Sequence, residues 1–556
     1  MFEKNLESFE NISLKRRLSK ISPIESRVGI SYCVTPSNDY ILLKDDVPLD
    51  DLTNPRKAAK EALTHAIKGE LKSSDTIILF GIGLGYLLDE TFNNYPSRIY
   101  LYEPDINLLH FVLSNVDISE HLASGRVYIT SDMDDLIARL NSTYLTKDRV
   151  EIVYLKNYAI LKNKELLQLT QKVLDTCKSK IVDINTITKF SKRWVTNTVH
   201  NIGASLERPV YLLSDLENKF IGQTALVVAA GPSLTDNIEK IKSNREAYVI
   251  FAVNKVVRDL MQNGIIPDFV VCLDAKNMSK TLGGLEEHLQ KTCCIMDIRA
   301  DYALMSMPFR KTFINFSDTD FFMQKYAKFG NDLKFYESGG SASTLALITA
   351  ARLGFSKIIC VGLDLAFKDN TIYSTGETMT RISQEQILVD AVKKNLVKVK
   401  SINGNYVYTR EDYATFVKHF ETIIKELNHH EIYNVSTFGA YIEGMKNKPL
   451  EEITGFMPVS LSAVAFVQPY KFEMKELMQE EFNQINNIIT LLSKGNFSPP
   501  LISAIIKSVM VYQYMQAEVL QVLQRNLDPS CAEEFLERTK ATIKYLVEIL
   551  QKNKLI

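Results

Sequence analysis

The sequence predicts an α/β protein that ends in a helical segment, and three observations support this fold class. Short runs that are apolar throughout recur between residues 76 and 365. Stretches with helical periodicity lie between most of them, which is typical of a mostly parallel sheet covered on both faces. The runs stop near residue 455, and the rest of the chain has apolar side chains at spacings of three and four, as in helices.

The length of 556 residues predicts several domains. We expect an N-terminal domain over residues 1–205, a central domain over 206–455 and a C-terminal helical domain over 456–556. A charge-rich stretch at about 156–193 has helical spacing and is expected to link the first two. In the last domain the expected helices cover residues 473–494, 501–527 and 531–552, a pattern typical of a small bundle.

Composition excludes several classes of protein. The net charge is -1, so we expect no strong nonspecific binding to nucleic acid or to an anionic membrane. The N-terminus lacks the apolar core of a signal peptide, and no apolar run is long enough to span a bilayer. The seven cysteines include no CxxC pair, and Cys272 and Cys360 lie inside apolar runs. These features predict a cytoplasmic protein with reduced thiols and no metal site built from cysteines.

The N-terminal domain contains a glycine loop between two apolar runs. The first run is residues 76–80, and the second is residues 99–105 with Glu103 near its end. The loop carries the three glycines Gly81, Gly83 and Gly85. This arrangement predicts a Rossmann-like domain in which Glu103 stands where a carboxylate binds a ribose. Taken alone it favours a methyltransferase, but no Asp/Asn-Pro-Pro-Tyr motif follows. We therefore expect a domain that keeps the fold without methyl transfer.

The central domain is expected to hold at least six strands. They are residues 225–230, 248–253, 269–274, 293–298, 313–316 and 357–365. The first runs into the turn Gly231-Pro232-Ser233, with Ser233 as the expected N-cap of the next helix. The N–H groups of that helix start would form a phosphate site. A plain strand-to-helix turn is the alternative, and geometry alone favours it.

Polar residues end several of these strands. Asn254 follows the second, Asp274 ends the third and Asp364 ends the last. In open α/β sheets such residues line the ligand crevice, although Asp274 is also a candidate helix cap. Residues Gly339, Gly340 and Ser341 precede an apolar helix expected at 342–353. A glycine pair and a serine at a buried helix start again offer backbone donors to an anion.

These segments together resemble one family. The Gly-Pro-Ser-Leu turn, Asn254, the GGSAS helix opening and the segment GLDLAF are similar to the central domain of motility-associated (Maf) flagellin glycosyltransferases, which itself resembles bacterial sialyltransferases. Residues 432–453 resemble the end of that domain. The resemblance implies a central glycosyltransferase-like domain that transfers pseudaminic or legionaminic acid from its CMP-activated form to Ser or Thr hydroxyls of flagellin, for flagellum assembly and motility.

The resemblance also implies roles for individual residues. The residues expected to bind the nucleotide sugar are Gly231, Pro232, Ser233, Asn254, Gly339, Gly340 and Ser341. In related sialyltransferases a histidine acts as the general base, and many Maf sequences have one shortly after GxDLAF. Here that stretch is KDNTIYSTGET, with Tyr373 in place of a histidine. The catalytic candidates are therefore Asp274, Asp364 and Tyr373, and the downstream histidines are His419, His429 and His430. No cofactor is firmly implied, and a divalent metal is compatible with the chemistry.

Two other functions stay open at this stage. A pterin pyrophosphokinase shares the central domain family and needs ATP with a divalent metal, for which Asp274 and Asp364 would supply carboxylates. The long additions at both ends of the chain argue against a small-molecule kinase. A flagellin-binding chaperone without activity is the other alternative, because the expected histidine is missing. In any of these the C-terminal helices are suited to hold a helical partner.

Overall fold

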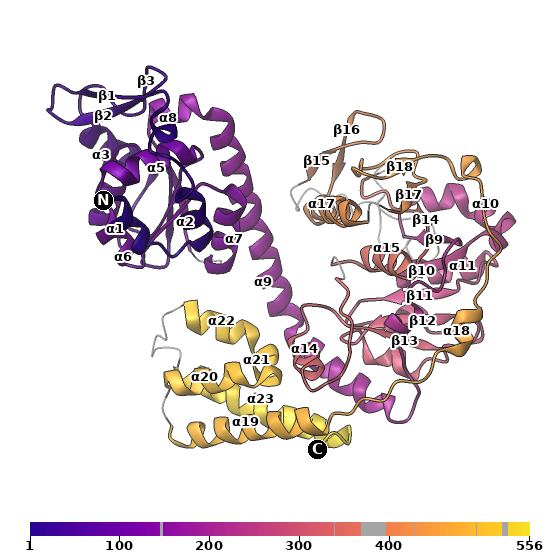
Figure 1. Ribbon diagram of the computed structural model, residues 1–556. Helices are drawn as coiled ribbons and strands as arrows, with labels where there is room; N and C mark the ends of the chain where they lie inside the picture. The colour runs from indigo at the N-terminus through magenta and orange to yellow at the C-terminus, as the bar shows by residue number, and fades with distance from the viewer. Residues whose placement is uncertain (145–147, 338–339, 368–395, 428, 496, 525–531) are drawn as a thin grey trace. The chain divides into compact units, whose positions relative to one another are not determined.

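The computed structural model describes the chain except residues 145–147, 338–339, 368–395, 428, 496 and 525–531 (Figure 1). Contacts divide the chain into two compact units. The first is Met1–Lys189 with Leu520–Leu527, and the second is Phe190–Val519 with Asp528–Ile556. Helix α9 (Asn163–Ser205) contributes to both. The predicted α/β class with C-terminal helices is confirmed.

The first unit is built on a parallel sheet of four strands. Their order is β6 (Val127–Thr130), β5 (Arg98–Tyr102), β4 (Thr76–Phe80) and β7 (Val150–Tyr154). Numbered along the chain this order is 3-2-1-4, as in half of a Rossmann sheet. Helices α4 (Tyr86–Asn94), α5 (Ile106–Asn115) and α7 (Met133–Thr143) connect the strands. The predicted Rossmann-like arrangement is confirmed, although β5 ends at Tyr102, before Glu103.

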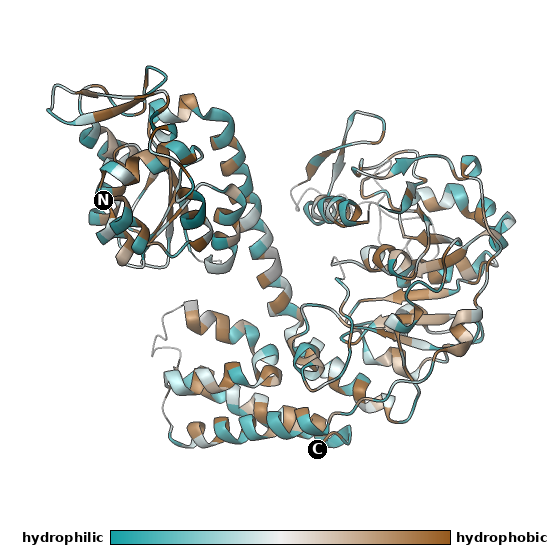
Figure 2. Ribbon diagram, viewed as in Figure 1, coloured by the Kyte–Doolittle hydropathy of each residue, from teal (hydrophilic) through white to brown (hydrophobic). Residues whose placement is uncertain are grey.

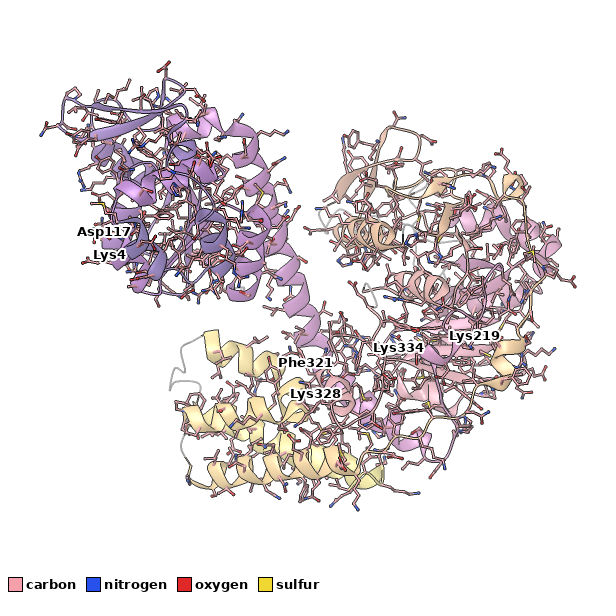
Figure 3. The ribbon with its side chains drawn as sticks, viewed as in Figure 1. Lys4, Asp117, Lys219, Phe321, Lys328 and Lys334 are labelled. Carbon is pink, nitrogen blue, oxygen red and sulfur yellow. The ribbon has the colours of Figure 1, made fainter. Side chains whose placement is uncertain are left out.

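The segment before β4 has structure that the sequence did not reveal. It contains α1 (Phe2–Glu7), α2 (Ile12–Leu18), the antiparallel strands β1 (Ile30–Val34), β2 (Tyr40–Lys44) and β3 (Val47–Pro48), and α3 (Pro55–Ala66). Lys4 forms an ion pair of 2.7 Å with Asp117 (Figure 3). Buried Asn5 donates from Nδ2 to the carbonyls of Leu113 and Val116, both at 2.8 Å. These bonds attach α1 to the end of α5.

The second unit contains a parallel sheet of nine strands. The order is β18 (Lys446–Asn447), β17 (Glu431–Asn434), β14 (Lys357–Val361), β9 (Thr224–Val228), β10 (Val249–Val253), β11 (Phe269–Cys272), β12 (Cys293–Asp297), β13 (Thr312–Asn315) and β8 (Tyr211–Leu212). All six predicted strands are present. Strands β8, β17 and β18 were missed because they are short and lie at or near the edges.

Helix α15 (Ala342–Arg352) is the central packing element of this sheet. Its residues from Thr344 to Ala351 are all buried. It contacts β9, β10, β11 and β14. Figure 2 shows the strands of this sheet as predominantly hydrophobic ribbon. The rings of Phe251 and Phe269 stack at 4.9 Å on neighbouring strands. The prediction of a buried helix at 342–353 is confirmed, and its start lies at the carboxyl edge of the sheet.

The C-terminal part is helical, as predicted, but one expected helix is divided. The helices are α19 (Lys475–Ser493), α20 (Pro499–Lys507), α21 (Val509–Tyr514), α22 (Gln516–Gln524) and α23 (Ala532–Lys552). The break at Ser508 is stabilised by buried Glu481, which accepts the Ser508 hydroxyl at 2.7 Å and the backbone N–H of Met510 at 3.1 Å. Among the described residues no helix is long and apolar enough to cross a membrane.

Candidate functional site

The order of the second sheet reverses between β9 and β14. From β9 the chain adds β10 to β13 on one side, then returns to place β14 and β17 on the other. Ligands of open α/β sheets bind outside the carboxyl ends of the strands at such a reversal. The turn after β9 carries Gly231 to Ser233, and Asp364 follows β14. The topology therefore brings two of the predicted segments to one position.

The Gly-Pro-Ser turn is attached to the segment after β14. The N–H of Gly231 donates to the carbonyl of Gly362 at 2.7 Å. A Cβ at Gly231 would lie 2.4 Å from both that carbonyl and Oδ2 of Asp364. Only glycine fits this approach. The N–H of Ser233 donates to Asp364 Oδ2 at 2.8 Å.

Two expectations about this turn are wrong. Gly231 is the N-cap of the helix that follows, Pro232 is its first residue, and Ser233 lies inside it. That helix is a short 3-10 segment, η3 (Pro232–Asn237). Because Asp364 already accepts the N–H of Ser233, this donor is not available to a phosphate. The carboxylate of Asp364 takes the place of the expected anion.

Asp364 holds together three segments at the sheet edge. It is 1% exposed, and besides Ser233 it accepts the hydroxyl of Ser436, which follows β17. Its backbone carbonyl accepts the N–H of Ala440 at 2.8 Å. The sequence interpretation missed Ser436, since it lies 72 residues from Asp364 in no recognisable motif. Asp364 is therefore a positioning residue beneath the site.

The hydroxyl of Ser233 has a different environment from its backbone. The residue is 1% exposed, and its Oγ has no hydrogen-bond partner among the described residues. A buried hydroxyl without a partner costs free energy, which a bound ligand or water can recover. The side chain of Ser233, unlike its backbone N–H, therefore remains a candidate for binding the nucleotide sugar.

Asn254 and Asp274 meet at the carboxyl ends of β10 and β11. Asn254 is 3% exposed and donates from Nδ2 to Asp274 Oδ2 at 2.9 Å. Asp274 is exposed. It caps no helix, because the next one, α12 (Met278–Leu282), has Asn277 as its N-cap and its first N–H donates to Asp301 at 2.9 Å. The pair thus presents one buried amide and one solvent-facing carboxylate.

The start of α15 forms the third predicted segment. Ser341 is its N-cap and makes a reciprocal capping box with Thr344, both bonds being 3.1 Å. Gly340 has a φ of +75°, which favours glycine. Gly339 lies outside the described residues. The first N–H groups of an α-helix have no partner within it, so this helix start can donate to an anion.

An arginine near the same edge had not been predicted. Arg299, after β12, is 6% exposed and donates from Nε to Asp297 Oδ1 at 2.9 Å. Its Nη1 donates to Thr319 at 3.0 Å, and its guanidinium lies 5.1 Å from the ring of Trp194 on α9. The Asp297 carboxylate raises the pKa of Arg299 against the effect of burial. Asp-Ile-Arg at a strand end was a weak signal for this pair.

Two asparagines of α9 fix the loops after β11 and β12. Asn197 donates to the carbonyls of Ala275 at 3.0 Å and Arg299 at 2.9 Å. Asn201 donates to those of Ile298 at 2.7 Å and Ala300 at 3.0 Å. Both side chains are buried. The end of α9 therefore belongs structurally to the sheet edge.

We expect Asn197→Ala to destabilise the second unit by about 1–3 kcal/mol, because it leaves two buried carbonyls without their donor. Urea unfolding followed by the fluorescence of Trp194, the only tryptophan, measures the change. The control is Arg193→Ala at an exposed position of α9. Equal unfolding midpoints for the two variants would mean that Asn197 does not stabilise the loops after β11 and β12.

The other catalytic candidates are Tyr373 and the three downstream histidines, and none of them is placed at the candidate site. Tyr373 lies outside the described residues. His430 bonds through Nδ1 to the carbonyl of Phe355 at 2.8 Å, and Phe355 precedes β14. His430 and His429 therefore lie at the amino ends of the strands, opposite the candidate site. His419 is half-buried in α17 (Glu411–Glu426). In the described part of the chain no group of three or more His, Cys, Asp or Glu side chains is arranged to hold a metal ion.

The glycine loop of the first unit is filled by the protein itself. Gly81, Gly83 and Gly85 all have positive φ. Glu103 is fully buried, accepts the N–H of Ile82 at 3.1 Å and accepts the hydroxyl of Tyr158. Burial raises the pKa of Glu103 to about 7. Its carboxylate thus faces the loop and Tyr158, not an open ribose site.

Asp50 occupies the other side of this loop. It is 1% exposed, and its Oδ2 lies 2.6 Å from the position of a Cβ at Gly83. Burial raises the pKa of Asp50 to about 7, an effect partly offset by the backbone N–H of Leu84. The ring of Tyr158 lies 2.4 Å from a Cβ at Gly81. A cofactor would have to displace these side chains.

Comparisons with known proteins bear on the central region and on the fold. Residues 196–370 match the family model "6-hydroxymethylpterin diphosphokinase MptE-like". The matched region extends from α9 past β14, so it includes most of the candidate site. A curated protein of Treponema pallidum (strain Nichols), described as uncharacterized, is 29% identical over 117 residues, which are 21% of this chain and 52% of that protein. The alignment thus spans about half the length of that relative.

A solved structure matches the whole chain. It is the MAf glycosyltransferase from Magnetospirillum magneticum AMB-1, with a TM-score of 0.66 and 17% sequence identity. The match covers 100% of this chain and 97% of that chain. The chain has the fold of this MAf glycosyltransferase. The central region is in addition an MptE-like domain.

Proposed function

We propose that the chain is a glycosyltransferase that moves pseudaminic or legionaminic acid from its CMP-activated form to Ser or Thr hydroxyls of flagellin in the bacterial cytoplasm. The observation that carries this proposal is the likeness to a MAf glycosyltransferase over the full length. The sheet edge supports it, because the Ser233 hydroxyl, the Asn254–Asp274 pair and the start of α15 all lie at the carboxyl ends of parallel strands.

The residues at this edge suggest how the transfer proceeds. The bond from the anomeric carbon to the phosphate oxygen of CMP breaks, and the acceptor oxygen bonds to that carbon. The backbone N–H groups of Gly340, Ala342 and Ser343, at the start of α15, stabilise the charge on the departing phosphate. Asn254 binds polar groups of the nucleotide or sugar. Asp274, which is exposed beside Asn254, acts as the general base and takes the proton from the Ser or Thr hydroxyl of flagellin.

We expect CMP to raise the thermal stability of the second unit. A ligand at about 100 times its dissociation constant stabilises the native state by roughly 2.7 kcal/mol. Asn254→Ala and Ser341→Ala should each remove most of this shift, because they delete the buried amide and the helix cap. Differential scanning fluorimetry measures the shift, and mass spectrometry of flagellin incubated with a CMP-nonulosonic acid measures transfer.

The matched control is Ser493→Ala, in α19 and outside the site, which should keep the full CMP shift. Binding of flagellin without transfer by the wild-type chain would favour the chaperone alternative. A CMP shift that persists in Asn254→Ala and Ser341→Ala would place the nucleotide elsewhere and contradict the proposed site.

A pterin pyrophosphokinase is the second candidate, and the MptE-like family model favours it. That reaction needs ATP and a divalent metal, and exposed Asp274 is the carboxylate best placed to bind one. Asp364 is less suited, because its oxygens already accept Ser233 and Ser436. A stability shift with ATP and magnesium, absent with CMP, would favour this candidate over sugar transfer.

A further inference from the structure

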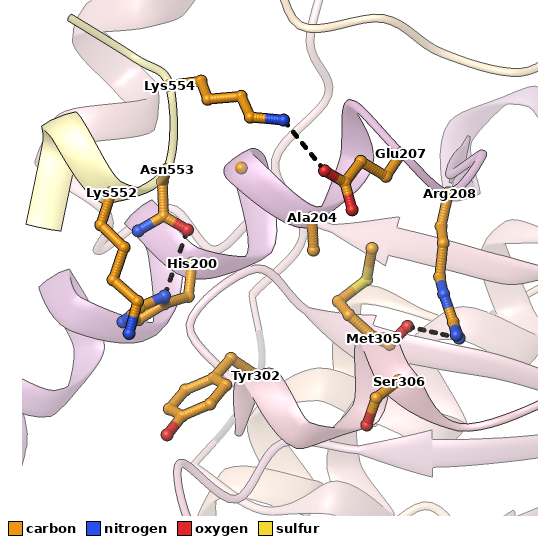
Figure 4. Close-up of a pocket in the computed structure, with 11 residues that line it drawn as sticks. His200, Ala204, Glu207, Arg208, Tyr302, Met305, Ser306, Lys552, Asn553 and Lys554 are labelled. Atoms are coloured by element: carbon orange, nitrogen blue, oxygen red, sulfur yellow. Dashed lines mark hydrogen bonds and ion pairs between the residues drawn. The ribbon is translucent and has the colours of Figure 1, made fainter.

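A cavity of about 360 Å³ lies in the second unit (Figure 4). Its walls are the end of α9 with the residues after it, the 3-10 helix η6 (Tyr302–Ser306) and the end of α23. The lining residues that matter are His200, Glu207, Arg208, Tyr302, Lys552 and Lys554. None of them belongs to the candidate glycosyltransferase site. A cavity of this size suits a small molecule.

The cavity has an excess of positive charge. Arg208, Lys552 and Lys554 line it with Glu207 as the single carboxylate side chain. Lys554 pairs with Glu207 at 3.1 Å, and both are largely exposed. Arg208 donates from Nη1 to the carbonyl of Met305 at 3.0 Å. Neither Arg208 nor Lys552 forms an ion pair with a residue that the structure describes, so two cations remain for a ligand.

His200 adds a titratable group between these walls. Its Nδ1 lies 3.2 Å from Oδ1 of Asn553, and its ring centroid lies 4.7 Å from that of Tyr302. Because the amide oxygen accepts, Nδ1 carries the proton and Nε2 is the atom that titrates. Burial and the nearby Lys552 lower the pKa of His200, and the bond to Asn553 opposes them. An anion bound in the cavity would offset the charge of Lys552 and so raise the pKa of His200.

A close contact between α9 and the end of α23 brings His200, Lys552 and Asn553 together. A Cβ at Gly203 would lie 2.6 Å from both Cβ and Oδ1 of Asn553. The end of α23 therefore packs directly on α9 only because residue 203 is glycine. This contact fixes Asn553 against His200 and sets Lys552 beside the ring.

We propose that this cavity binds a small molecule carrying a phosphate or carboxylate group, at a site that shares no lining residue with the candidate glycosyltransferase site. Arg208 and Lys552 bind the anionic group, and protonated His200 donates a hydrogen bond from Nε2. The half-exposed ring of Tyr302 contacts the carbon part of the ligand. The proposal does not depend on the glycosyltransferase assignment.

The test uses the full chain with inorganic phosphate and with citrate as probes. Binding is followed by calorimetry and by the NMR signal of His200 in protein labelled at histidine Cε1. We expect at least one of the two anions to bind, and we expect the bound anion to raise the pKa of His200. The double variant Arg208→Gln, Lys552→Gln should bind at least tenfold more weakly, whereas Lys544→Gln, at an exposed position of α23 outside the cavity, should bind as the wild type does.

The pH dependence supplies an independent measurement. His200→Gln should keep binding at pH 8. As pH falls from 8 to 6, the affinity of the wild type should rise relative to that of His200→Gln, because protonation of His200 adds a positive charge beside Lys552. Comparing the two proteins at each pH cancels the protonation of phosphate and citrate themselves. The proposal is overturned if neither anion binds, if the double variant binds as tightly as the wild type, or if the His200 signal does not respond. Binding of phosphate but not citrate would identify phosphate as the group recognised.

Discussion

Asp364→Ala is expected to destabilise the second unit by roughly 2–5 kcal/mol and to abolish CMP binding. The substitution leaves the buried N–H of Ser233 and the hydroxyl of Ser436 without their acceptor, and each such loss costs about 1–3 kcal/mol. The turn at Gly231 would also lose the carboxylate against which it packs. Stability and binding therefore fall together.

Urea unfolding reported by Trp194 fluorescence measures the stability, and thermal shift with CMP measures binding. The matched control is Asp332→Ala, because Asp332 is also an aspartate of the second unit but is exposed. It should leave both the unfolding midpoint and the CMP shift unchanged. If Asp364→Ala were as stable as the control, Asp364 would not be the residue that holds the three segments.

Asp50→Asn is expected to stabilise the first unit at pH 8 and to stabilise it much less at pH 5. The pKa of Asp50 is raised from 3.8 to about 7 in the folded chain. Between these values the folded chain keeps a proton that the unfolded chain has released, so stability falls as pH rises through this window and is constant above it. At about 1.4 kcal/mol for each pH unit, the cost of ionising Asp50 is on the order of 4 kcal/mol.

Hydrogen exchange of the peptide covering β4 and α4 measures this effect, since Trp194 belongs to the other unit. The variant and the wild type are compared at the same pH, so the pH dependence of the intrinsic amide exchange rate and the titration of Glu103 affect both proteins equally. We expect much slower exchange in Asp50→Asn at pH 8 and a smaller slowing at pH 5. Faster exchange of the variant at pH 8 would mean that ionised Asp50 stabilises the loop.

The interior strands were predictable because burial on both faces makes a strand apolar throughout. This held for β4 and for β9 to β14. The antiparallel strands β1, β2, β15 (Val397–Lys400) and β16 (Tyr406–Thr409) were missed, because they are short, only partly buried and of mixed composition. The long helix expected at 501–527 is divided by Ser508, whose stabilising partner Glu481 is far away in sequence.

The candidate site was predictable in part. The positions of Asn254 and Asp274 at the ends of neighbouring strands followed from the sequence, whereas their hydrogen bond did not. The place of Ser341 before an apolar helix was also predicted, but its capping box with Thr344 was not. Ser436, Arg299 and the asparagines of α9 carry no local pattern, because their roles depend on distant backbone groups.

The sequence by itself therefore determined the fold class, the two parallel sheets and the helix that covers the larger one, because periodicity and turn residues act locally. It also placed Asn254, Asp274 and Asp364 at the carboxyl ends of strands. Only the tertiary structure decided which of them remain available to a ligand. Asp364 and Glu103 are both acidic residues near glycine turns, yet each is buried and accepts a backbone N–H of its own chain. A buried N–H takes the nearest acceptor in space, and the sequence does not specify that neighbour.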